Sequence, residues 1–224
     1  MIKPIIGIFD SGIGGRSIEK EIKKTLPRYK TIYLADSKNF PYGEKTPLQL
    51  KKIAAFNTRY LLRKGANLIV VACNTATVHA IGDLRKRFPD VPFVGVEPAV
   101  KPAGAIAKKG MIILSSPRAT KSKQIALLIK KFVRGVKVYN IGSIELVRAV
   151  EEHWDGKKIK RILEKVLPKK LTSKCDVLVL GCTHFPLIKD KIQKHVGKGI
   201  KIIDSGEAVA RRVKFLVSDI IPPR

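Results

Sequence analysis

The sequence predicts an α/β protein of two similar domains, each a mainly parallel sheet flanked by helices, with the active site in the cleft between them. Three observations support this fold. Short apolar runs alternate with longer amphipathic segments along the 224 residues, which is typical of parallel sheets covered by helices. A hydrophobic content of 45% is enough for a substantial core. Two motifs of the first half recur in the second half, which indicates that one topology is used twice.

The expected strands are apolar runs of strand length, rich in Val and Ile: 5–9, 31–35, 68–72, 93–96, 111–114, 136–140, 177–180 and 201–203. Between them, Leu, Ile, Val and Ala recur at helical spacing in 15–25, 47–64, 77–87, 121–133, 145–152, 157–167 and 207–217. Pro27, Pro89 and Pro168 stand where three of these helices should stop. Crossovers expected near 98–102 and 206–210 predict one domain of residues 1–97 plus 208–224 and a second of 98–207.

Composition excludes several classes of protein. The longest apolar runs, 67–72 and 177–180, fall far short of the roughly 20 residues that span a bilayer, so no membrane partner is expected. The first strand begins almost at once, without a leader pattern, which predicts a cytoplasmic protein. Three cysteines without a C-x-x-C pair favour reduced thiols over a disulfide framework or a metal site.

The chain is strongly basic, with 45 Lys and Arg against 18 Asp and Glu and a formal net charge of +27. Such a charge attracts polyanions or acidic substrates. The basic residues are scattered over expected helix faces with few aromatic side chains among them, which disfavours a nucleic-acid partner. A nucleic-acid-associated regulatory protein remains an alternative, and clustering of lysines on one face would favour it.

Two segments of the first half of the sequence recur in the second half, and they point to a pair of thiols. Residues 9–12 (Phe-Asp-Ser-Gly) return as 203–206 (Ile-Asp-Ser-Gly), and the strand ending at Cys73 is echoed by the strand ending at Cys182. Each cysteine is therefore expected to end a buried strand and open a helix. Two similar domains that face each other would bring these thiols to opposite walls of one cleft.

A thiol at a helix N-terminus gives up its proton more easily than a free thiol, so Cys73 and Cys182 are candidate acid/bases. The alternative is that each is a small buried hydrophobe, the usual fate of a free cysteine, but the repeated context favours chemistry. Cys175 lies at the other end of its strand and is expected to be structural. Asp10 and His184 lie close to the strand ends and could bind a thiol or the substrate ammonium group.

Residues 10–15 (Asp-Ser-Gly-Ile-Gly-Gly) form a glycine-rich strand-to-helix turn. A phosphate or dinucleotide loop is the alternative interpretation, but the segment lacks the G-x-G-x-x-G spacing and a Walker lysine. The glycines more simply let the backbone approach a small carboxylate-bearing substrate. Residues 41–43 (Pro-Tyr-Gly) and the Asn74-Thr75 pair supply donors suited to a carboxylate.

At these residues the chain resembles the glutamate racemases. The resemblance runs from about residue 5 to about residue 215 and rests on the segments 10–15, 41–43, 72–76, 95–99, 181–187 and 204–206. It implies inversion of an amino acid by Cys73 and Cys182 as two opposed acid/bases, without a cofactor, and a role in supplying D-glutamate for peptidoglycan. It also implies a glutamate-binding enzyme that forms a homodimer. The implied assisting residues are Asp10, His184 and Glu151, and those implied to hold the substrate are Ser11, Pro41, Tyr42, Gly43, Asn74, Thr75, Ser116 and Thr183.

One departure bears on the substrate. Where the family commonly has Ala-Thr-x-Gly-Thr, residues 115–120 read Ser-Ser-Pro-Arg-Ala-Thr. Ser116 could replace one carboxylate-binding hydroxyl, whereas Thr120 would have to supply the other after a shift. A racemase for aspartate or another acidic amino acid is therefore the alternative. The chain is also shorter than typical members, mostly around residues 136–173 and after Val217.

Overall fold

The structure is a computed structural model that describes residues 4–220, with the side chains of the last two of these left out. The end of the predicted first domain, residues 221–224, lies outside the described residues. Contacts divide the chain into two compact units, residues 1–97 with 205–224 and residues 98–204. Each unit contains one four-stranded parallel sheet, which confirms the predicted fold class.

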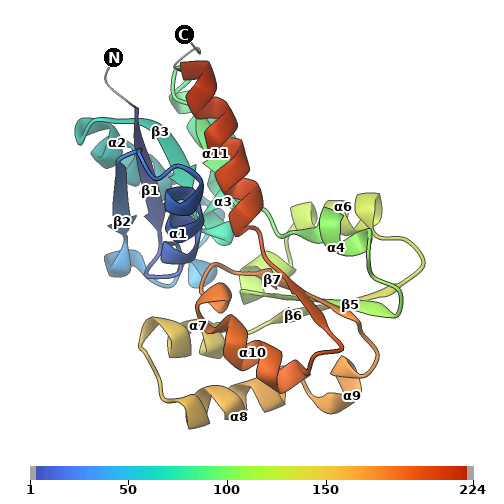
Figure 1. Cartoon of the computed structure of the whole chain (residues 1–224). Helices are drawn as coiled ribbons and strands as arrows, with labels where there is room; N and C mark the ends of the chain where they lie inside the picture. Colours follow the sequence, from blue (N-terminus) through green and yellow to red (C-terminus); the bar gives the residue numbers. More distant parts are fainter. Residues whose placement is uncertain (1–3, 221–224) are drawn as a thin grey trace. The chain divides into compact units, whose positions relative to one another are not determined.

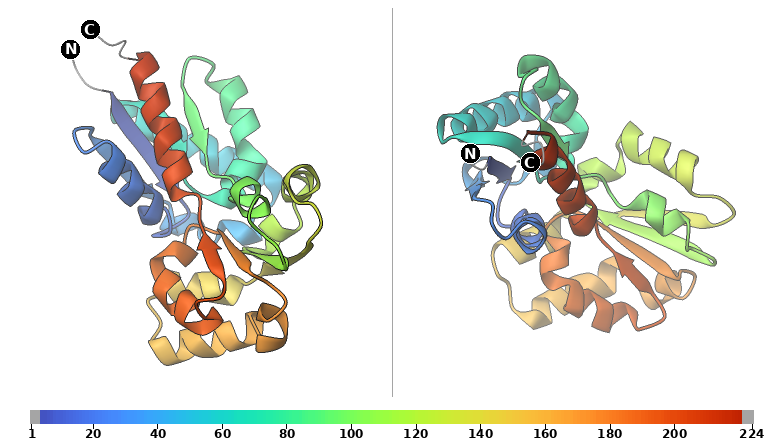
Figure 2. Two further views of the ribbon diagram at one scale, coloured as in Figure 1. Left: turned by 45° about the vertical axis from the view of Figure 1, so that its right-hand side comes forward. Right: turned by 45° about the horizontal axis from the view of Figure 1, so that its top comes forward.

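The first unit has the strand order β2-β1-β3-β4 (Figure 1). Its strands are β1 (Ile5–Asp10), β2 (Thr31–Ala35), β3 (Ala66–Val71) and β4 (Phe93–Gly95). Four helices cover this sheet: α1 (Arg16–Thr25), α2 (Pro47–Arg63), α3 (Asn74–Arg87) and α11 (Gly206–Ile220). The last helix of the chain thus belongs to the unit that the first strand begins, and it packs along α1 (Figure 2).

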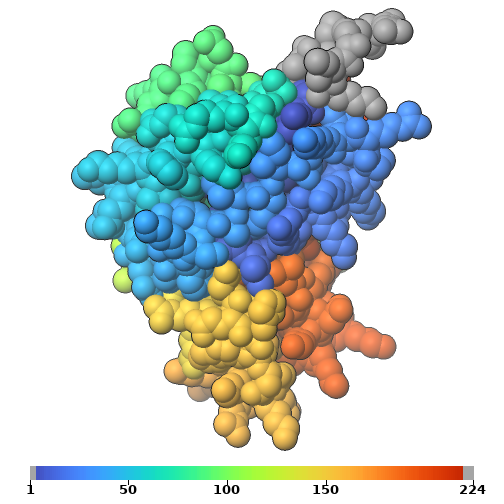
Figure 3. Space-filling model, turned by 90° about the vertical axis from the view of Figure 1, so that its left-hand side faces the viewer, coloured from blue at the N-terminus to red at the C-terminus, as the bar shows by residue number. Residues whose placement is uncertain are grey.

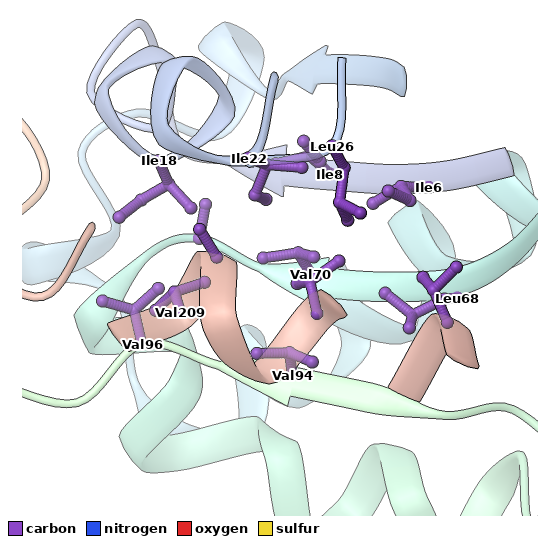
Figure 4. Close-up of a cluster of buried hydrophobic side chains, with 14 residues drawn as sticks. Ile6, Ile8, Ile18, Ile22, Leu26, Leu68, Val70, Val94, Val96 and Val209 are labelled. Atoms are coloured by element: carbon purple, nitrogen blue, oxygen red, sulfur yellow. The ribbon is translucent and has the colours of Figure 1, made fainter. Parts of the chain in front are cut away.

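Alternation along the strands gives this sheet two apolar faces. Ile8, Val70 and their neighbours face α1 and α11, where Ile22 and Val209 close the core (Figure 4). On the opposite face, Phe9 and its neighbours pack with apolar residues of α2 and α3. A sheet buried on both sides explains why these strands are continuous apolar runs.

The second unit repeats this topology, with the order β6-β5-β7-β8. Its strands are β5 (Gly110–Ser115), β6 (Lys137–Gly142), β7 (Val177–Gly181) and β8 (Lys201–Ile203). The helices α4 (Val100–Gly104) and α6 (Lys123–Phe132) pack on one face. On the other face lie α7 (Ile144–Glu151), α8 (Gly156–Val166) and α10 (Lys189–Val196) (Figure 1). Short helices α5 (Pro117–Thr120) and α9 (Lys169–Thr172) complete the unit.

Three 3-10 turns lie in the loops: η1 (Ser37–Asn39), η2 (Tyr42–Glu44) and η3 (Phe185–Ile188). Helix α3 begins at Asn74, three residues before the predicted start, because the chain turns helical directly after Cys73. Among residues 4–220, no helix is long and apolar enough to cross a membrane.

Candidate active site

The candidate residues of each unit gather at the carboxyl ends of its strands, the edge at which α/β sheets bind ligands. In the first unit Asp10 ends β1 and Cys73 follows β3, and these two strands are paired. In the second unit Ser116 follows β5 and Cys182 follows β7, and the last residues of these two strands are register partners. Each cysteine therefore follows the third strand of its unit, at the same topological position.

Cys73 is the N-cap residue of α3 and is 7% exposed. Its backbone is extended, and its thiol makes no capping hydrogen bond to the helix. The first N–H groups of a helix carry positive potential, which favours a thiolate over a thiol nearby. Cys73 belongs, with Tyr42 and Phe9, to the buried apolar cluster of this face.

Asp10 is fully buried beside the turn that opens α1. One oxygen of its carboxylate accepts the backbone N–H and the hydroxyl of Ser11, the latter at 3.1 Å. A Cβ on Gly15 would lie 2.8 Å from the Cβ of Asp10 and 3.0 Å from that of Ala72. This glycine is therefore needed for the turn to lie against the strand ends that carry Asp10 and Cys73.

The loop of Pro41, Tyr42 and Gly43 is held through the buried Tyr42 side chain. Its hydroxyl donates to Oδ2 of Asp36 at 2.7 Å and accepts from Nδ2 of Asn57 at 2.9 Å. The bond from Phe40 to Pro41 is cis. Burial raises the pKa of Tyr42 well above its usual value, the hydrogen bond to Asp36 adds to this, and the charges of Cys73 and Asp10 contribute. The hydroxyl is therefore a proton donor throughout the physiological pH range.

Asp36, Asn39 and Asn57 form a hydrogen-bond network around the Tyr42 hydroxyl, and the sequence reasoning missed all three. Asn39 donates to both oxygens of Asp36, at 2.9 and 3.0 Å, and Asn57 donates to Oδ2 at 3.1 Å. Asp36 directly follows β2, so its place at the same strand edge as Asp10 was available from the sequence. Asn57 lies in the middle of α2, and no local signal connects it to this loop.

Asn74 and Thr75 are both buried in the first turn of α3. The amide of Asn74 donates to the carbonyl of Val96 at 3.2 Å, which ties the helix start to the end of β4. Thr77 reinforces the same connection, because its hydroxyl donates to the carbonyl of Val71 and accepts the N–H of Val96. The turn that carries Cys73 is thus fixed to two strands.

Cys182 is connected to a histidine and a carboxylate. Its Sγ lies 3.7 Å from Nδ1 of His184, and Nε2 of His184 lies 2.8 Å from Oε2 of Glu151. His184 is 2% exposed, and the Glu151 side chain is 13% exposed. Since a carboxylate can only accept, it holds the imidazole proton on Nε2 and leaves Nδ1 to accept a proton from the thiol.

The surroundings of Cys182 differ from those expected in one respect. The residue does not open an α-helix: a turn at the buried Thr183 and at His184 leads into η3, and α10 begins only at Lys189. Pro186 near the start of η3 has no N–H with which to extend a helical ladder. His184 therefore lies next to the Cys182 thiol, whereas Cys73 has a helix N-terminus beside it.

Ser116 is the buried N-cap residue of α5, where its hydroxyl accepts the N–H of Ala119. A hydroxyl can donate as well as accept, so this contact is compatible with binding a carboxylate. Thr120 donates its proton to the carbonyl of Pro117 at 2.7 Å. The proton of Thr120 is therefore used within its own segment.

The third cysteine and the second Asp-Ser-Gly segment, which the sequence also singled out, lie away from the two thiols or hold the chain in place. Cys175 precedes β7, at the end of the strand opposite Cys182, and burial together with the charge of Asp176 raises the pKa of its thiol. In the echo of residues 203–206, Ser205 donates to the carbonyl of Glu97 and Asp204 pairs with Lys189 at 3.0 Å. The hydrogen bond and the ion pair of this second Asp-Ser-Gly segment thus stabilise the connection at which the chain returns to the first unit.

Comparison with known proteins identifies the family. The sequence pattern of the family described as Asp/Glu/Hydantoin racemase matches residues 15–213. A glutamate racemase of Pseudomonas paraeruginosa is 39% identical over 95% of this chain and 81% of its own length. One of Roseiflexus is 38% identical over 96% of this chain and 79% of its own.

Solved structures agree with these relatives. The Escherichia coli glutamate racemase in complex with L-glutamate and the activator UDP-MurNAc-ala matches with a TM-score of 0.90 and 35% identity, over 97% of this chain and 83% of that one. The glutamate racemase of Aquifex pyrophilus gives 0.75 and 32%, over 95% and 83%. An aspartate racemase of Picrophilus torridus, 18% identical over 96% and 94%, gives 0.65 and shares the fold. The chain therefore belongs to the Asp/Glu/hydantoin racemase family and, within it, to the glutamate racemases, which are amino-acid isomerases.

Proposed function

We propose that this chain interconverts L-glutamate and D-glutamate with Cys73 and Cys182 as two acid/bases and without a cofactor. The observation that carries the proposal is the equivalence of the two thiols. Each follows the third strand of a four-stranded parallel sheet of the same order, and each lies beside a group that can assist proton transfer, the N-terminus of α3 at Cys73 and His184 at Cys182. A structural cysteine needs neither the repeat nor these neighbours.

Inversion at the α-carbon requires one base and one acid on opposite faces of the substrate. One thiolate takes the α-proton, so that the Cα–H bond breaks and an S–H bond forms. The other thiol then delivers its proton to the opposite face of the carbanion and becomes a thiolate. The enzyme is left with the two protonation states exchanged, ready for the reverse reaction.

The neighbours of the two thiols have different parts in this scheme. At Cys182, His184 accepts the thiol proton on Nδ1, and the Glu151 carboxylate stabilises the resulting imidazolium. At Cys73, the N-terminus of α3 stabilises the thiolate, and Asp10 is placed to orient the substrate ammonium group. We assign Asp10, His184 and Glu151 as assisting residues on this basis.

The substrate is proposed from the solved relative and from the donors at the strand ends. The Escherichia coli enzyme was crystallised with L-glutamate. In this chain the hydroxyl, amide and backbone N–H donors of one substrate site would come from Ser11, Pro41 to Gly43, Asn74, Thr75, Ser116 and Thr183. Aspartate is the alternative, because residues 115–120 depart from the family pattern. A shorter acid would leave buried donors unpaired, at about 1–3 kcal/mol per group, so we expect glutamate to react at least roughly tenfold more efficiently.

The test is incubation of the purified protein with L-glutamate or L-aspartate in D2O, followed by chiral separation and deuterium counting. A two-thiol enzyme gives D-glutamate that carries deuterium at Cα, while the L-glutamate recovered early is still protiated. The variants Cys73→Ala and Cys182→Ala should each abolish racemisation without loss of the circular-dichroism spectrum. Cys175→Ala is the matched control and should keep its activity. Near-wild-type turnover in either of the first two variants would exclude the mechanism.

Three further expectations accompany this activity. The D-glutamate would serve peptidoglycan synthesis, the enzyme would work in the cytoplasm, and it would act as a homodimer. We also propose that the predicted domains, residues 1–97 plus 208–224 and residues 98–207, are the two halves that carry one thiol each. Sedimentation of the purified enzyme tests the dimer, and complementation of a D-glutamate auxotroph tests the cellular role.

A further inference from the structure

Three buried polar side chains of the first unit form a closed triangle of hydrogen bonds. The Tyr42 hydroxyl donates to Oδ2 of Asp36 at 2.7 Å, and Nδ2 of Asn57 donates to the same oxygen at 3.1 Å and to the Tyr42 hydroxyl at 2.9 Å. The three side chains are between 1% and 9% exposed. Because a carboxylate accepts only, the amide nitrogen of Asn57 must face Asp36, and this fixes which way the amide points. Each member of the triangle is therefore held by the other two.

The triangle connects three separate segments of the chain. Asp36 follows β2, Tyr42 lies in η2 and Asn57 lies in α2. The backbone N–H of Asp36 also donates to the carbonyl of Asp10 at 2.9 Å, which ties the triangle to the end of β1. These segments form part of the light-blue to cyan surface of the first unit (Figure 3), to which the three side chains contribute almost nothing. Buried groups therefore anchor the loop of residues 41–43 at the strand edge that carries Asp10.

Stability alone does not explain a carboxylate in this place. Tyr42 belongs to the apolar cluster of this face, where a polar group is costly unless it is hydrogen-bonded. The hydrogen bonds to the Asp36 carboxylate all come from neutral side chains, those of Asn39, Tyr42 and Asn57. Apolar side chains of similar size can replace such a buried cluster at little or no cost in stability. What apolar side chains would not supply is a fixed direction for the Tyr42 hydroxyl and its loop.

Helix α2 offers a direct comparison on its own buried side. Asn57 and Thr58 are the two polar residues of that side. Asn57 makes two hydrogen bonds of the triangle, whereas the Thr58 hydroxyl has no hydrogen-bond partner among residues 4–220. Burial of a polar group in α2 and connection to the loop are thus separated in two adjacent residues.

The anchored loop lies near the first thiol. The turn η2 packs against α3, the helix for which Cys73 is the N-cap residue, and Tyr42 and Cys73 belong to the same buried cluster. A loop that moved by about 1 Å would take its donors out of hydrogen-bond range of a bound carboxylate, and a misplacement of this size can weaken an active site up to about a hundredfold. The position of the loop is therefore a quantity on which substrate binding depends.

We propose that Asn57 is a positioning residue for substrate binding. Through Asp36 and the Tyr42 hydroxyl, it holds the loop of residues 41–43 where the donors of the loop meet a substrate carboxylate. This inference rests on the proposed function, in which that loop holds glutamate. Because Asn57 acts through the loop and transfers no proton, its loss should weaken binding of the substrate and of the transition state alike. The expected signature is a raised KM with kcat nearly unchanged.

The test compares Asn57→Leu with Thr58→Val, which replace buried polar residues at adjacent positions by apolar ones of similar size. Racemisation is measured from both enantiomers of glutamate, and circular dichroism and urea unfolding report on the fold. Asn57→Leu removes one hydrogen bond to a carboxylate and one to a hydroxyl, so KM should rise at least about fivefold while kcat stays within about threefold of the wild-type value. Thr58→Val should leave both constants within about twofold. If leucine is not accommodated, Asn57→Ser is the second variant, and KM should still rise because one hydroxyl proton cannot serve both oxygens.

A double-mutant cycle with Tyr42→Phe shows whether Asn57 acts through the hydroxyl. Tyr42→Phe keeps the ring and removes the shared hydroxyl, so it should raise KM by itself. The KM of the double variant should then lie well below the product of the two single effects. Hydrogen exchange of residues 37–46 adds a measurement that needs no substrate. Relative to the second unit, exchange there should be at least about fivefold faster in Asn57→Leu and unchanged in Thr58→Val.

The possible outcomes separate this inference from the proposed function. An unchanged KM in Asn57→Leu would overturn the positioning role, and so would an equal rise in Asn57→Leu and Thr58→Val. Single effects on KM that multiply in the double variant, or a fall in kcat without a rise in KM, would also overturn it. If the wild type racemises no glutamate, the proposed function fails, and the exchange of residues 37–46 still decides whether Asn57 holds the loop.

Discussion

Replacement of Glu151 by glutamine is a sharp test of how Cys182 is assisted. The carboxylate accepts the Nε2 proton of the buried His184 at 2.8 Å and so leaves Nδ1 facing the thiol at 3.7 Å. A hydrogen bond to a charged group is worth about 1.5–3 kcal/mol, against about 0.5–1.5 kcal/mol for a neutral one. Glu151→Gln should therefore raise the barrier to proton transfer at Cys182 by about 1–2 kcal/mol, a fall in kcat/KM of roughly fivefold to thirtyfold.

The assay is racemisation followed from both enantiomers. Because L-glutamate and D-glutamate have equal free energies, kcat/KM must fall by the same factor in both directions, whereas kcat can change more from one side. The matched control is Glu152→Gln, the same substitution at the next residue, which is exposed and bonded to Trp154. If kcat/KM of the Glu151→Gln variant stays within twofold of the wild-type value in both directions, the argument that the carboxylate holds the imidazole proton on Nε2 is refuted.

Three further predictions concern the turn, the substrate and acid stability. Gly15→Ala should lower the free energy of unfolding by about 1–3 kcal/mol in urea, because its Cβ would lie 2.8 Å from that of Asp10, while Gly156→Ala, which meets nothing within 4 Å, should not. Ser116→Ala should raise KM for glutamate while changing kcat little. An unchanged KM would mean that another residue donates the hydrogen bond to the substrate carboxylate. Burial acts to raise the pKa of Glu19, but hydrogen bonds from three side chains outweigh it, and the net effect lowers the pKa below its usual value. The ionised carboxylate therefore stabilises the fold above about pH 4.3, and this stabilisation is lost as the pH falls. Glu19→Gln should therefore flatten the acid limb of a stability profile measured between pH 6 and pH 3, and an unchanged limb would contradict this.

The fold was predictable because its strands are buried on both faces. Continuous apolar runs such as 68–72 and 177–181 are readable without knowledge of their neighbours. The short helices α4, α5 and α9 were not predicted, because four or five residues carry no helical periodicity. Helix α10 was not among the helices expected from apolar spacing, since Ile192 is its one buried residue.

The site was predictable where a motif lies at a strand end and not where contacts come from a distance. Cys73, Asp10 and Cys182 all lie within two residues of a strand terminus, so topology alone groups them by sheet edge. The bond between His184 and Glu151 spans 33 positions, and only the resemblance to known racemases suggested it. Asn57 was missed for the same physical reason, because its partner Asp36 lies 21 positions away and nothing in the sequence around Asn57 marks it.

The return of α11 to the first sheet has a consequence for how the chain is made. Val209, Ala210, Val213 and Val217 fill the core face of a sheet whose first strand begins near residue 5. During synthesis, the residues of the second unit emerge without interruption and can pack as soon as they leave the ribosome. The first unit must instead wait, with Ile8 and Val70 uncovered on one side, until α11 has been translated. A nascent chain stalled before Gly206 would therefore expose an apolar sheet face, which makes the first unit the natural client of a chaperone and the last part of the molecule to become protease-resistant.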